Sequence, residues 1–168
     1  HGGDMVEALY PFSVYSVSGN DEVDAKSWGI CEAFGLPYVV ASRPQPGGLA
    51  GTTCDAAAAA GIPSMIAEAG SSGLLTEPET QMMVDGVLNS LRYLGVLPGD
   101  VATSKVERVD QFTWIRSPEE GMWYPSVSTG DKVTSGQSLG RIGNLYGDTL
   151  TELTAPHDGV ILFITSAA

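Results

Sequence analysis

Histidine is scarce in this 168-residue sequence, with only His1 and His157, and the first candidate for catalysis is Glu68. Glu68 ends the apolar segment Ile62–Ala67, and the glycine- and serine-rich segment Gly70–Gly73 follows soon after it. Ligands of α/β sheets bind at the carboxyl ends of strands. Partial burial also raises the pKa of a carboxyl group toward the range that suits general acid–base catalysis. Glu68 is therefore a catalytic candidate, and the alternative is a solvated glutamate at the end of a strand.

Three other patterns lack the spacing that their chemistry requires. His157, the only other histidine, lies in a predicted turn before Asp158 and Gly159, which is typical of a surface residue. The segment Gly70–Gly73 does not have the GxSxG spacing of a nucleophile elbow. The segment Gly47–Thr52 lacks the Gly-Lys-Ser/Thr ending of a phosphate-binding loop. The sequence thus argues against a serine hydrolase and a nucleotide site.

The elements that would position Glu68 alternate between strand and helix, which predicts an α/β layer over residues 1–98. Asn20 is the predicted N-cap of a helix that ends at Gly35. A buried strand is predicted over Tyr38–Ala41, and the proline- and glycine-rich segment Arg43–Gly51 predicts a loop.

Two more helices and a strand complete this predicted layer. Thr52 or Thr53 caps a helix with an alanine-rich body, and a strand is predicted over Ile62–Glu68. Thr76 starts a long helix, because Thr76 and Glu79 have the spacing of a capping box. The apolar residues of this helix recur every three or four positions and predict a face that packs on a sheet: Val84, Val87, Leu88, Leu91 and Leu94.

The pattern then changes to short apolar segments separated by glycine, which predicts a small all-β module over residues 106–168 after a linker at 99–105. Gly130–Asn144 resembles the half-barrels of biotinyl and lipoyl domains. Such a carrier domain needs a lysine at its next hairpin, but no lysine follows Lys132. The segment Val106–Ile115 is a candidate for closing this module.

The charge, the apolar segments and the cysteines of the sequence indicate which partners and which cellular setting to expect. Lys and Arg number 8 against 20 Asp and Glu, a formal charge of −12, which argues against nucleic-acid and anionic-membrane partners. No apolar segment approaches the roughly 20 residues that span a bilayer. Cys31 and Cys54 form neither a CxxC motif nor a Cys/His cluster, so we expect a reduced, cytoplasmic protein without a disulfide scaffold.

Four segments carry a resemblance to a known family: His1–Asp4, Gly51–Thr53 with the alanine-rich helix after it, Gly61–Gly70, and Gly86–Gly95. Together, and in this order, they resemble the succinylglutamate desuccinylase/aspartoacylase family of zinc-dependent amidohydrolases. The resemblance implies a partial zinc-carboxypeptidase-like α/β layer, a mixed sheet with helices, followed by a small all-β barrel-sandwich (lipoyl-like) module. It implies that His1 is a metal ligand for Zn²⁺ and that Glu68 is the catalytic general base, so we expect the two side chains to lie close together at one rim of the sheet.

The sequence departs from the family in one respect. The family holds zinc with a His-x-x-Glu pair and a later histidine, and no His-x-x-Glu occurs here. Basic residues with which the family binds the substrate carboxylate are also absent. A catalytic zinc needs three protein ligands, so the site is incomplete, and we expect a fragment that is inactive by itself.

The sequence therefore predicts part of a zinc-dependent hydrolase that cleaves the amide bond of N-acyl amino acids or related small N-acyl compounds. The expected partner is this small-molecule substrate, and an oligomer is compatible with the sequence. The alternative is a non-catalytic binding or assembly module with a lipoyl-like barrel that lacks the carrier lysine.

Overall fold

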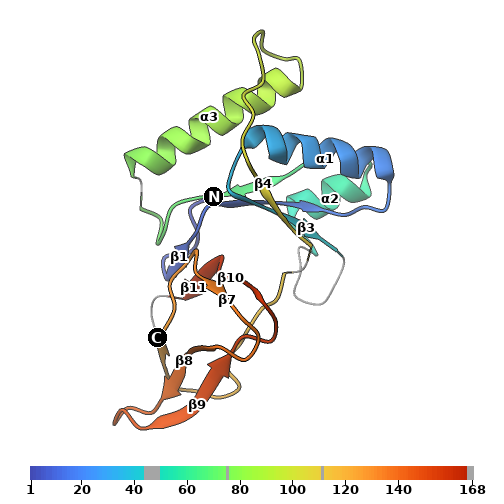
Figure 1. Ribbon diagram of the computed structural model, residues 1–168. Helices are drawn as coiled ribbons and strands as arrows, with labels where there is room; N and C mark the ends of the chain where they lie inside the picture. The colour runs from blue at the N-terminus through green and yellow to red at the C-terminus, as the bar shows by residue number, and fades with distance from the viewer. Residues whose placement is uncertain (44–49, 75, 111, 166–168) are drawn as a thin grey trace. The chain divides into compact units, whose positions relative to one another are not determined.

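The computed structural model of the chain describes residues 1–43, 50–74, 76–110 and 112–165 (Figure 1). Its contacts divide the chain into two compact units. Unit 1 contains His1, Pro11–Ala69 and Leu75–Thr113, and unit 2 contains Gly2–Tyr10, Gly70–Leu74 and Trp114–Ala168. Most of the loop predicted over residues 43–51 lies outside the described residues. The predicted domain boundaries, 1–98 and 106–168 with a linker at 99–105, stay a prediction.

Unit 1 is built on a mixed four-stranded sheet with the order β4-β2-β3-β5. The strands are β2 (Phe12–Ser16), β3 (Tyr38–Ser42), β4 (Ile66–Glu68) and β5 (Glu107–Val109). β2, β3 and β5 run parallel, and β4 runs antiparallel to β2. A mixed sheet with helices is the layer that the sequence predicts, although the strand predicted from residue 62 begins only at residue 66.

Two helices begin where their capping residues predict. α1 (Asp21–Phe34) is capped by the Asn20 side chain, which accepts hydrogen bonds from the backbone of the first turn. It ends at Gly35, whose φ of 84° favours glycine because a Cβ is strained there. α2 (Thr53–Ala59) is capped by the hydroxyl of Thr52.

The third helix, α3 (Glu77–Tyr93), begins after Thr76 as predicted, but it packs through a different face. Its buried residues are small or polar: Gly86, Asn89 and Ser90. The predicted apolar face is exposed at Val84, Val87, Leu88 and Leu94, so the prediction that this face packs on a sheet is wrong.

Specific contacts explain why α3 packs on α1 in this orientation. Gly86 lies directly against the ring of Phe34, with no room for a side chain. The Asn89 amide is buried and donates to the carbonyl oxygens of Ala33 and Ala102, and its oxygen accepts from the Ala102 N–H at 2.8 Å. Because a buried amide is costly without partners, these bonds orient the helix more strongly than its apolar periodicity does.

One part of the core of unit 1 lies between α1 and one face of the sheet. Alternate residues of β2 and β3 point to this face. They form a buried cluster with a cysteine of α1: Tyr15, Cys31, Val39 and Ala41. Both cysteines of the chain, Cys31 and Cys54, are buried free thiols.

Unit 2 is made of short antiparallel strands. β6 (Met122–Pro125), β8 (Ser138–Gly143) and β9 (Thr149–Thr154) form a three-stranded sheet. Two further pairs stand apart from it: β7 (Lys132–Val133) with β10 (Gly159–Val160), and β1 (Glu7–Leu9) with β11 (Phe163–Thr165). Within the described residues these strands form no closed barrel, so the predicted lipoyl-like barrel is not confirmed.

Two strand pairings differ from those expected for the β module. Residues 107–109, in the segment proposed to close it, form β5 and pair with β3 of unit 1 instead. The last strand, β11, pairs with β1 near the start of the chain. Both pairings join segments far apart in sequence, and short-range patterns do not report such partners.

No helix in the described part of the chain has the length and apolar character needed to cross a membrane.

Candidate functional site

The candidate site lies at the end of β4, where the backbone of His1 pairs with the outer edge of this strand. The His1 amino group donates to the carbonyl oxygen of Ala67 at 2.9 Å, and the Ala69 N–H donates to the His1 carbonyl oxygen at 3.0 Å. In a parallel pair of strands, one residue bonds to the two residues that flank its partner, as His1 bonds here to Ala67 and Ala69 on either side of Glu68. His1 therefore stands directly beside Glu68.

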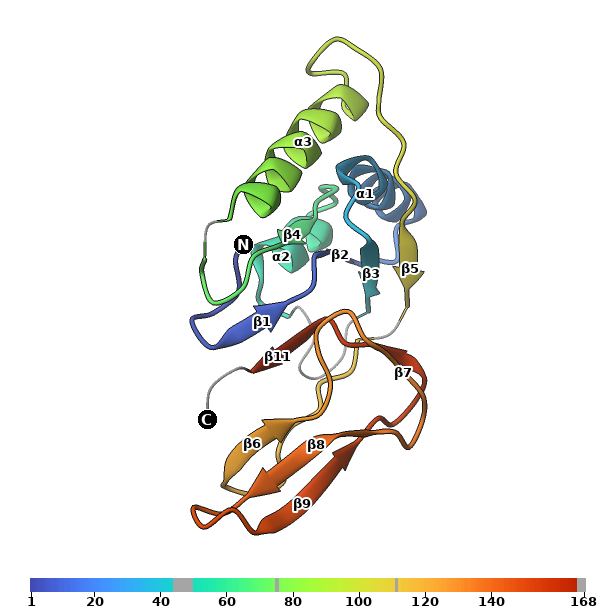
Figure 2. The ribbon, with the colours of Figure 1, turned by 60° about the vertical axis from the view of Figure 1, so that its left-hand side comes forward.

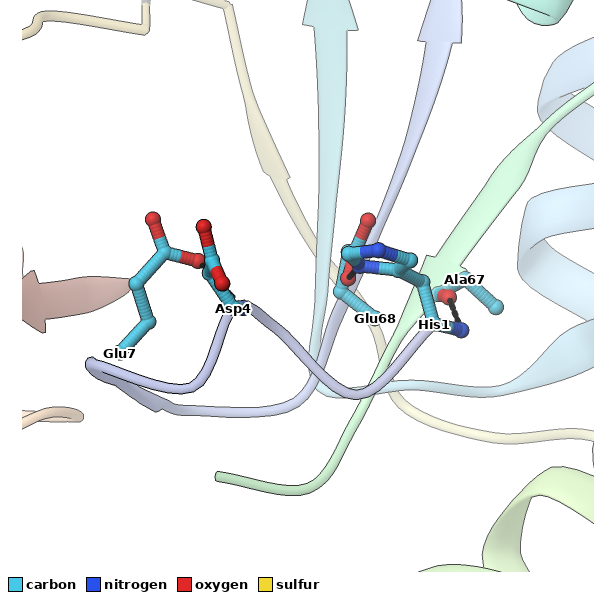
Figure 3. Close-up of polar contacts among 5 residues, drawn as sticks. All are labelled: His1, Asp4, Glu7, Ala67 and Glu68. Atoms are coloured by element: carbon cyan, nitrogen blue, oxygen red, sulfur yellow. Dashed lines mark hydrogen bonds and ion pairs between the residues drawn. The ribbon is translucent and has the colours of Figure 1, made fainter. Parts of the chain in front are cut away.

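The two side chains also meet. Nδ1 of His1 lies 2.8 Å from Oε2 of Glu68, and Figure 3 shows the imidazole ring beside the carboxylate. The His1 side chain is 66% exposed and the Glu68 side chain only 17%. The predicted proximity of His1 and Glu68 is thus confirmed, and the pair faces solvent through the histidine.

Glu68 lies at the carboxyl end of its own strand, as expected, but not at the carboxyl edge of the parallel strands. Because β4 is antiparallel to β2, Glu68 pairs with Phe12, the first residue of β2. The rule that places ligands beyond the carboxyl ends of parallel strands therefore does not explain this site. Its position depends on the pairing of His1 with β4.

The geometry allows two chemical roles for Glu68. A carboxylate beside a reacting water can accept its proton, as a general base does. A carboxylate bonded to one ring nitrogen of a histidine can instead orient the ring, so that the other nitrogen, Nε2, binds a metal. The 2.8 Å contact with Nδ1 suits the second role directly. The first role needs room for a water beside Glu68.

The described residues do not form a complete metal site. No group of three or more His, Cys, Asp and Glu side chains that could hold a metal occurs among them. His1 can supply one ligand, and a catalytic zinc needs three protein ligands with an open position. The described residues alone therefore do not complete a catalytic zinc site, and zinc binding stays a prediction.

Asp4, from the motif that begins at His1, has a structural role in unit 2. Its N–H donates to Oε2 of Glu7 at 3.0 Å, and its carboxylate accepts from the Met5 N–H at 2.7 Å. Glu7 returns a backbone bond to the Asp4 carbonyl oxygen at 3.1 Å. These bonds form the turn into β1 (Figure 3).

The hairpin between β8 and β9 has a loop where a carrier domain would need its lysine. The side chain of Asn144 accepts from the N–H groups of Tyr146 and Asp148, and its amide donates to the Asp148 carboxylate at 3.0 Å. The side chains of Leu145 and Tyr146 are 88% and 92% exposed. His157 is exposed in its turn, as predicted.

Sequence reasoning missed the backbone groups that place His1, the carbonyl of Ala67 and the N–H of Ala69. These groups occur in every residue, so no side-chain pattern could identify them. Only the pairing of segments that lie 66 positions apart shows their role.

Known proteins share this fold over nearly the whole chain. No protein-family model matches the sequence. The N-alpha-acetyl-L-2,4-diaminobutyric acid deacetylase of Halomonas elongata is 24% identical, over 96% of this chain and 48% of that protein. The chain therefore spans about half the length of the curated relative it matches.

Solved structures agree on the fold. The product-bound ectoine utilization protein EutE (DoeB) from Ruegeria pomeroyi has a TM-score of 0.85 at 20% identity, covering 99% of this chain and 52% of that one. A succinylglutamate desuccinylase/aspartoacylase from Rhodobacter sphaeroides has a TM-score of 0.82 at 21% identity, again over 99% and 52% of the two chains. The resemblance of this chain to the succinylglutamate desuccinylase/aspartoacylase family is thus confirmed.

Proposed function

We propose that this chain is part of a zinc-dependent hydrolase that cleaves the amide bond of N-acyl amino acids or related small N-acyl compounds. The observation that carries the proposal is the 2.8 Å contact between His1 and Glu68. The pair occurs in a chain that is 24% identical to a deacetylase and that shares its fold with a succinylglutamate desuccinylase/aspartoacylase. In such a hydrolase both residues would act on the same water and the same amide.

In this proposal Glu68 is the general base. Its carboxylate accepts a proton from the attacking water as the new C–O bond forms at the acyl carbon. Glu68 then gives this proton to the amine as the C–N bond breaks, which releases the free amine and the carboxylic acid that keeps the second proton of the water. Its limited exposure, 17%, favours this role because a partly buried carboxylate is less solvated by bulk water.

His1 is the proposed metal ligand of this chain, and its two companion ligands would come from outside the described residues. A zinc ion bound there would supply a water of lowered pKa and would polarise the substrate carbonyl. The His1 side chain is 66% exposed, so its ring is accessible to a metal ion. The chain by itself would be inactive.

The charge of the chain favours one group of substrates. A formal charge of −12 repels strongly anionic compounds unless the rest of the enzyme is basic. A succinyl group adds a carboxylate to the substrate, whereas an acetyl group adds none. The relative from Halomonas elongata is named for an N-acetylated diamino acid, and we propose substrates of this less anionic kind.

Acyl release from matched N-acetyl and N-succinyl amino acids, measured with a longer protein that supplies the two other ligands, tests this function. We expect hydrolysis with the acetyl compounds preferred, and His1→Ala should abolish both zinc binding and hydrolysis. His157→Ala is the matched control and should change neither, because His157 is an exposed turn residue. Unchanged zinc and turnover in His1→Ala would contradict the proposal.

A further inference from the structure

The hydroxyl of Ser71 bonds to both backbone groups of one residue in β1. The Leu9 N–H donates to Ser71 Oγ at 3.0 Å, and Ser71 Oγ donates to the Leu9 carbonyl oxygen at 3.4 Å. A serine hydroxyl can accept and donate at the same time, so it meets the two groups that a neighbouring strand would otherwise bond. Figure 2 shows the Gly70–Leu74 loop, in green, beside β1, which also pairs with β11.

Backbone hydrogen bonds extend this contact along the loop. The Ser72 N–H donates to the Glu7 carbonyl oxygen at 2.7 Å, and the Gly73 N–H donates to the Gly2 carbonyl oxygen at 3.3 Å. We call these two bonds, together with the two bonds of the Ser71 hydroxyl, the β1 clasp. The clasp thus joins the loop to the chain at three places, all within unit 2.

The backbone of Ser72 shows that the loop is held in a particular conformation. Its φ is 51°, and among the described residues Ser72 is the one residue other than glycine with a positive φ. A residue with a side chain is strained in this conformation and keeps it only where surrounding contacts hold it. The β1 clasp supplies such contacts on either side of Ser72.

The clasp joins the two segments that lead away from the candidate site. Gly2 follows His1 by one peptide bond. Gly70 follows Glu68 and Ala69, and the Ala69 N–H donates to the His1 carbonyl oxygen at 3.0 Å. The two segments are therefore bonded to each other from the site as far as β1. A change in the clasp reaches the site along both of these segments.

We propose that Ser71 is a positioning residue for the pair of His1 and Glu68. Its hydroxyl holds the two segments together and so keeps Oε2 of Glu68 beside Nδ1 of His1, at 2.8 Å. A carboxylate at this position favours the ring tautomer with the proton on Nδ1, and Nε2 is then the nitrogen that can bind a metal. The inference rests on the proposed function, because the proposed hydrolase is what would use this tautomer.

Nitrogen-15 NMR of this chain at about pH 9, where an imidazole is neutral, measures the tautomer of His1. Ser71→Ala should lower the share of the Nδ1–H form about twofold or more. It should also raise hydrogen exchange of the Ala69 amide, measured at neutral pH, about tenfold. Ser71→Thr keeps the hydroxyl and should restore both values.

Asn144→Ala is the matched control for these measurements. It removes hydrogen bonds from an exposed loop of the same unit and should change neither the tautomer nor the exchange. If Ser71→Ala does not fold, Ser71→Cys replaces it, with a smaller change in the same direction because a thiol is a weaker donor and acceptor. Unchanged values in the folded Ala or Cys variant would overturn the inference, and so would Ser71→Thr values that match those of Ser71→Ala.

Kinetics distinguish this inference from the proposed function. In a longer protein that supplies the other zinc ligands, Ser71→Ala should lower kcat about tenfold and leave KM within about twofold, as expected for a group that orients a metal ligand. Ser71→Thr should restore kcat, and an unchanged kcat in Ser71→Ala would overturn the positioning role. A parent protein without hydrolysis would contradict the proposed function instead, and the NMR measurement would then decide the role of Ser71 by itself.

Discussion

The end of β4 in unit 1 and the loop between β8 and β9 in unit 2 hold polar side chains together in different ways. At β4, His1 and Glu68 meet across 67 positions of sequence. In the hairpin loop, the bonds of Asn144 reach no farther than Asp148. The first arrangement needs the folded sheet, whereas the second is a local turn that forms from five consecutive residues.

This difference shows where the chemistry of the molecule lies. The hairpin loop is self-contained and presents Leu145 and Tyr146, two side chains without acid–base or metal-binding capacity at neutral pH. The end of β4 joins a histidine and a carboxylate that have both capacities. The candidate site thus lies in unit 1.

The largest expected effect concerns the completeness of that site. The isolated chain should bind zinc weakly and without defined stoichiometry, because it supplies one of three expected ligands. Its hydrolysis of N-acyl amino acids should be undetectable above background. Equilibrium dialysis with zinc and an acyl-release assay measure both. Tight binding of one zinc per chain would show that all the ligands lie within this chain, and it would contradict the claim that the site is incomplete.

A smaller effect distinguishes the buried amide of unit 1 from the exposed one of unit 2. Asn89→Ala should destabilise unit 1 by on the order of 3 kcal/mol, since it leaves backbone groups of Ala33 and Ala102 without their partner. Asn144→Ala should cost about 1 kcal/mol or less, because water replaces its bonds. Hydrogen exchange in increasing urea, followed separately for amides of α3 in unit 1 and of β8 in unit 2, measures the two effects. Equal losses of stability in Asn89→Ala and Asn144→Ala would show that the burial of the amide does not determine how much it stabilises its unit.

The smallest expected effect is a pH dependence of unit 1. Burial raises the pKa of the Cys31 thiol from 9.0 to about 12. The folded state then holds this proton more tightly than the unfolded state, so the stabilisation is complete below pH 9 and is lost as pH rises toward 12. At pH 10 the loss should be about 1 kcal/mol. Cys31→Ala should remove this part of the pH dependence in urea unfolding between pH 8 and pH 10, and an unchanged slope would contradict the assignment to Cys31.

Local signals in the sequence predict the helices of unit 1 well. Asn20 and Gly35 bound α1, and Thr52 caps α2, because caps and glycine ends act within one turn of helix. The pairing of His1 with Glu68 was predicted from family resemblance. Periodicity and spacing alone single out Glu68 but give it no partner.

The features that sequence reasoning missed all depend on distant partners. The orientation of α3 is set by the hydrogen bonds of Asn89 to Ala33 and Ala102. The apolar spacing within α3 does not indicate these partners. β5 pairs with β3 across about seventy positions, and β11 pairs with β1 at the other end of the chain. Short strands carry too few residues to specify such partners by pattern.

One measurement tests the central claim, that Glu68 is the proton acceptor, most directly. In the longer protein, Glu68→Gln removes the proton acceptor and retains an oxygen that can accept a hydrogen bond from His1. The account predicts one bound zinc per chain, an unchanged Tm, and turnover reduced by about 10²- to 10⁴-fold. A loss of less than about 100-fold with zinc retained is the cost of an orienting partner of a metal ligand, and it would contradict the role of Glu68 as general base.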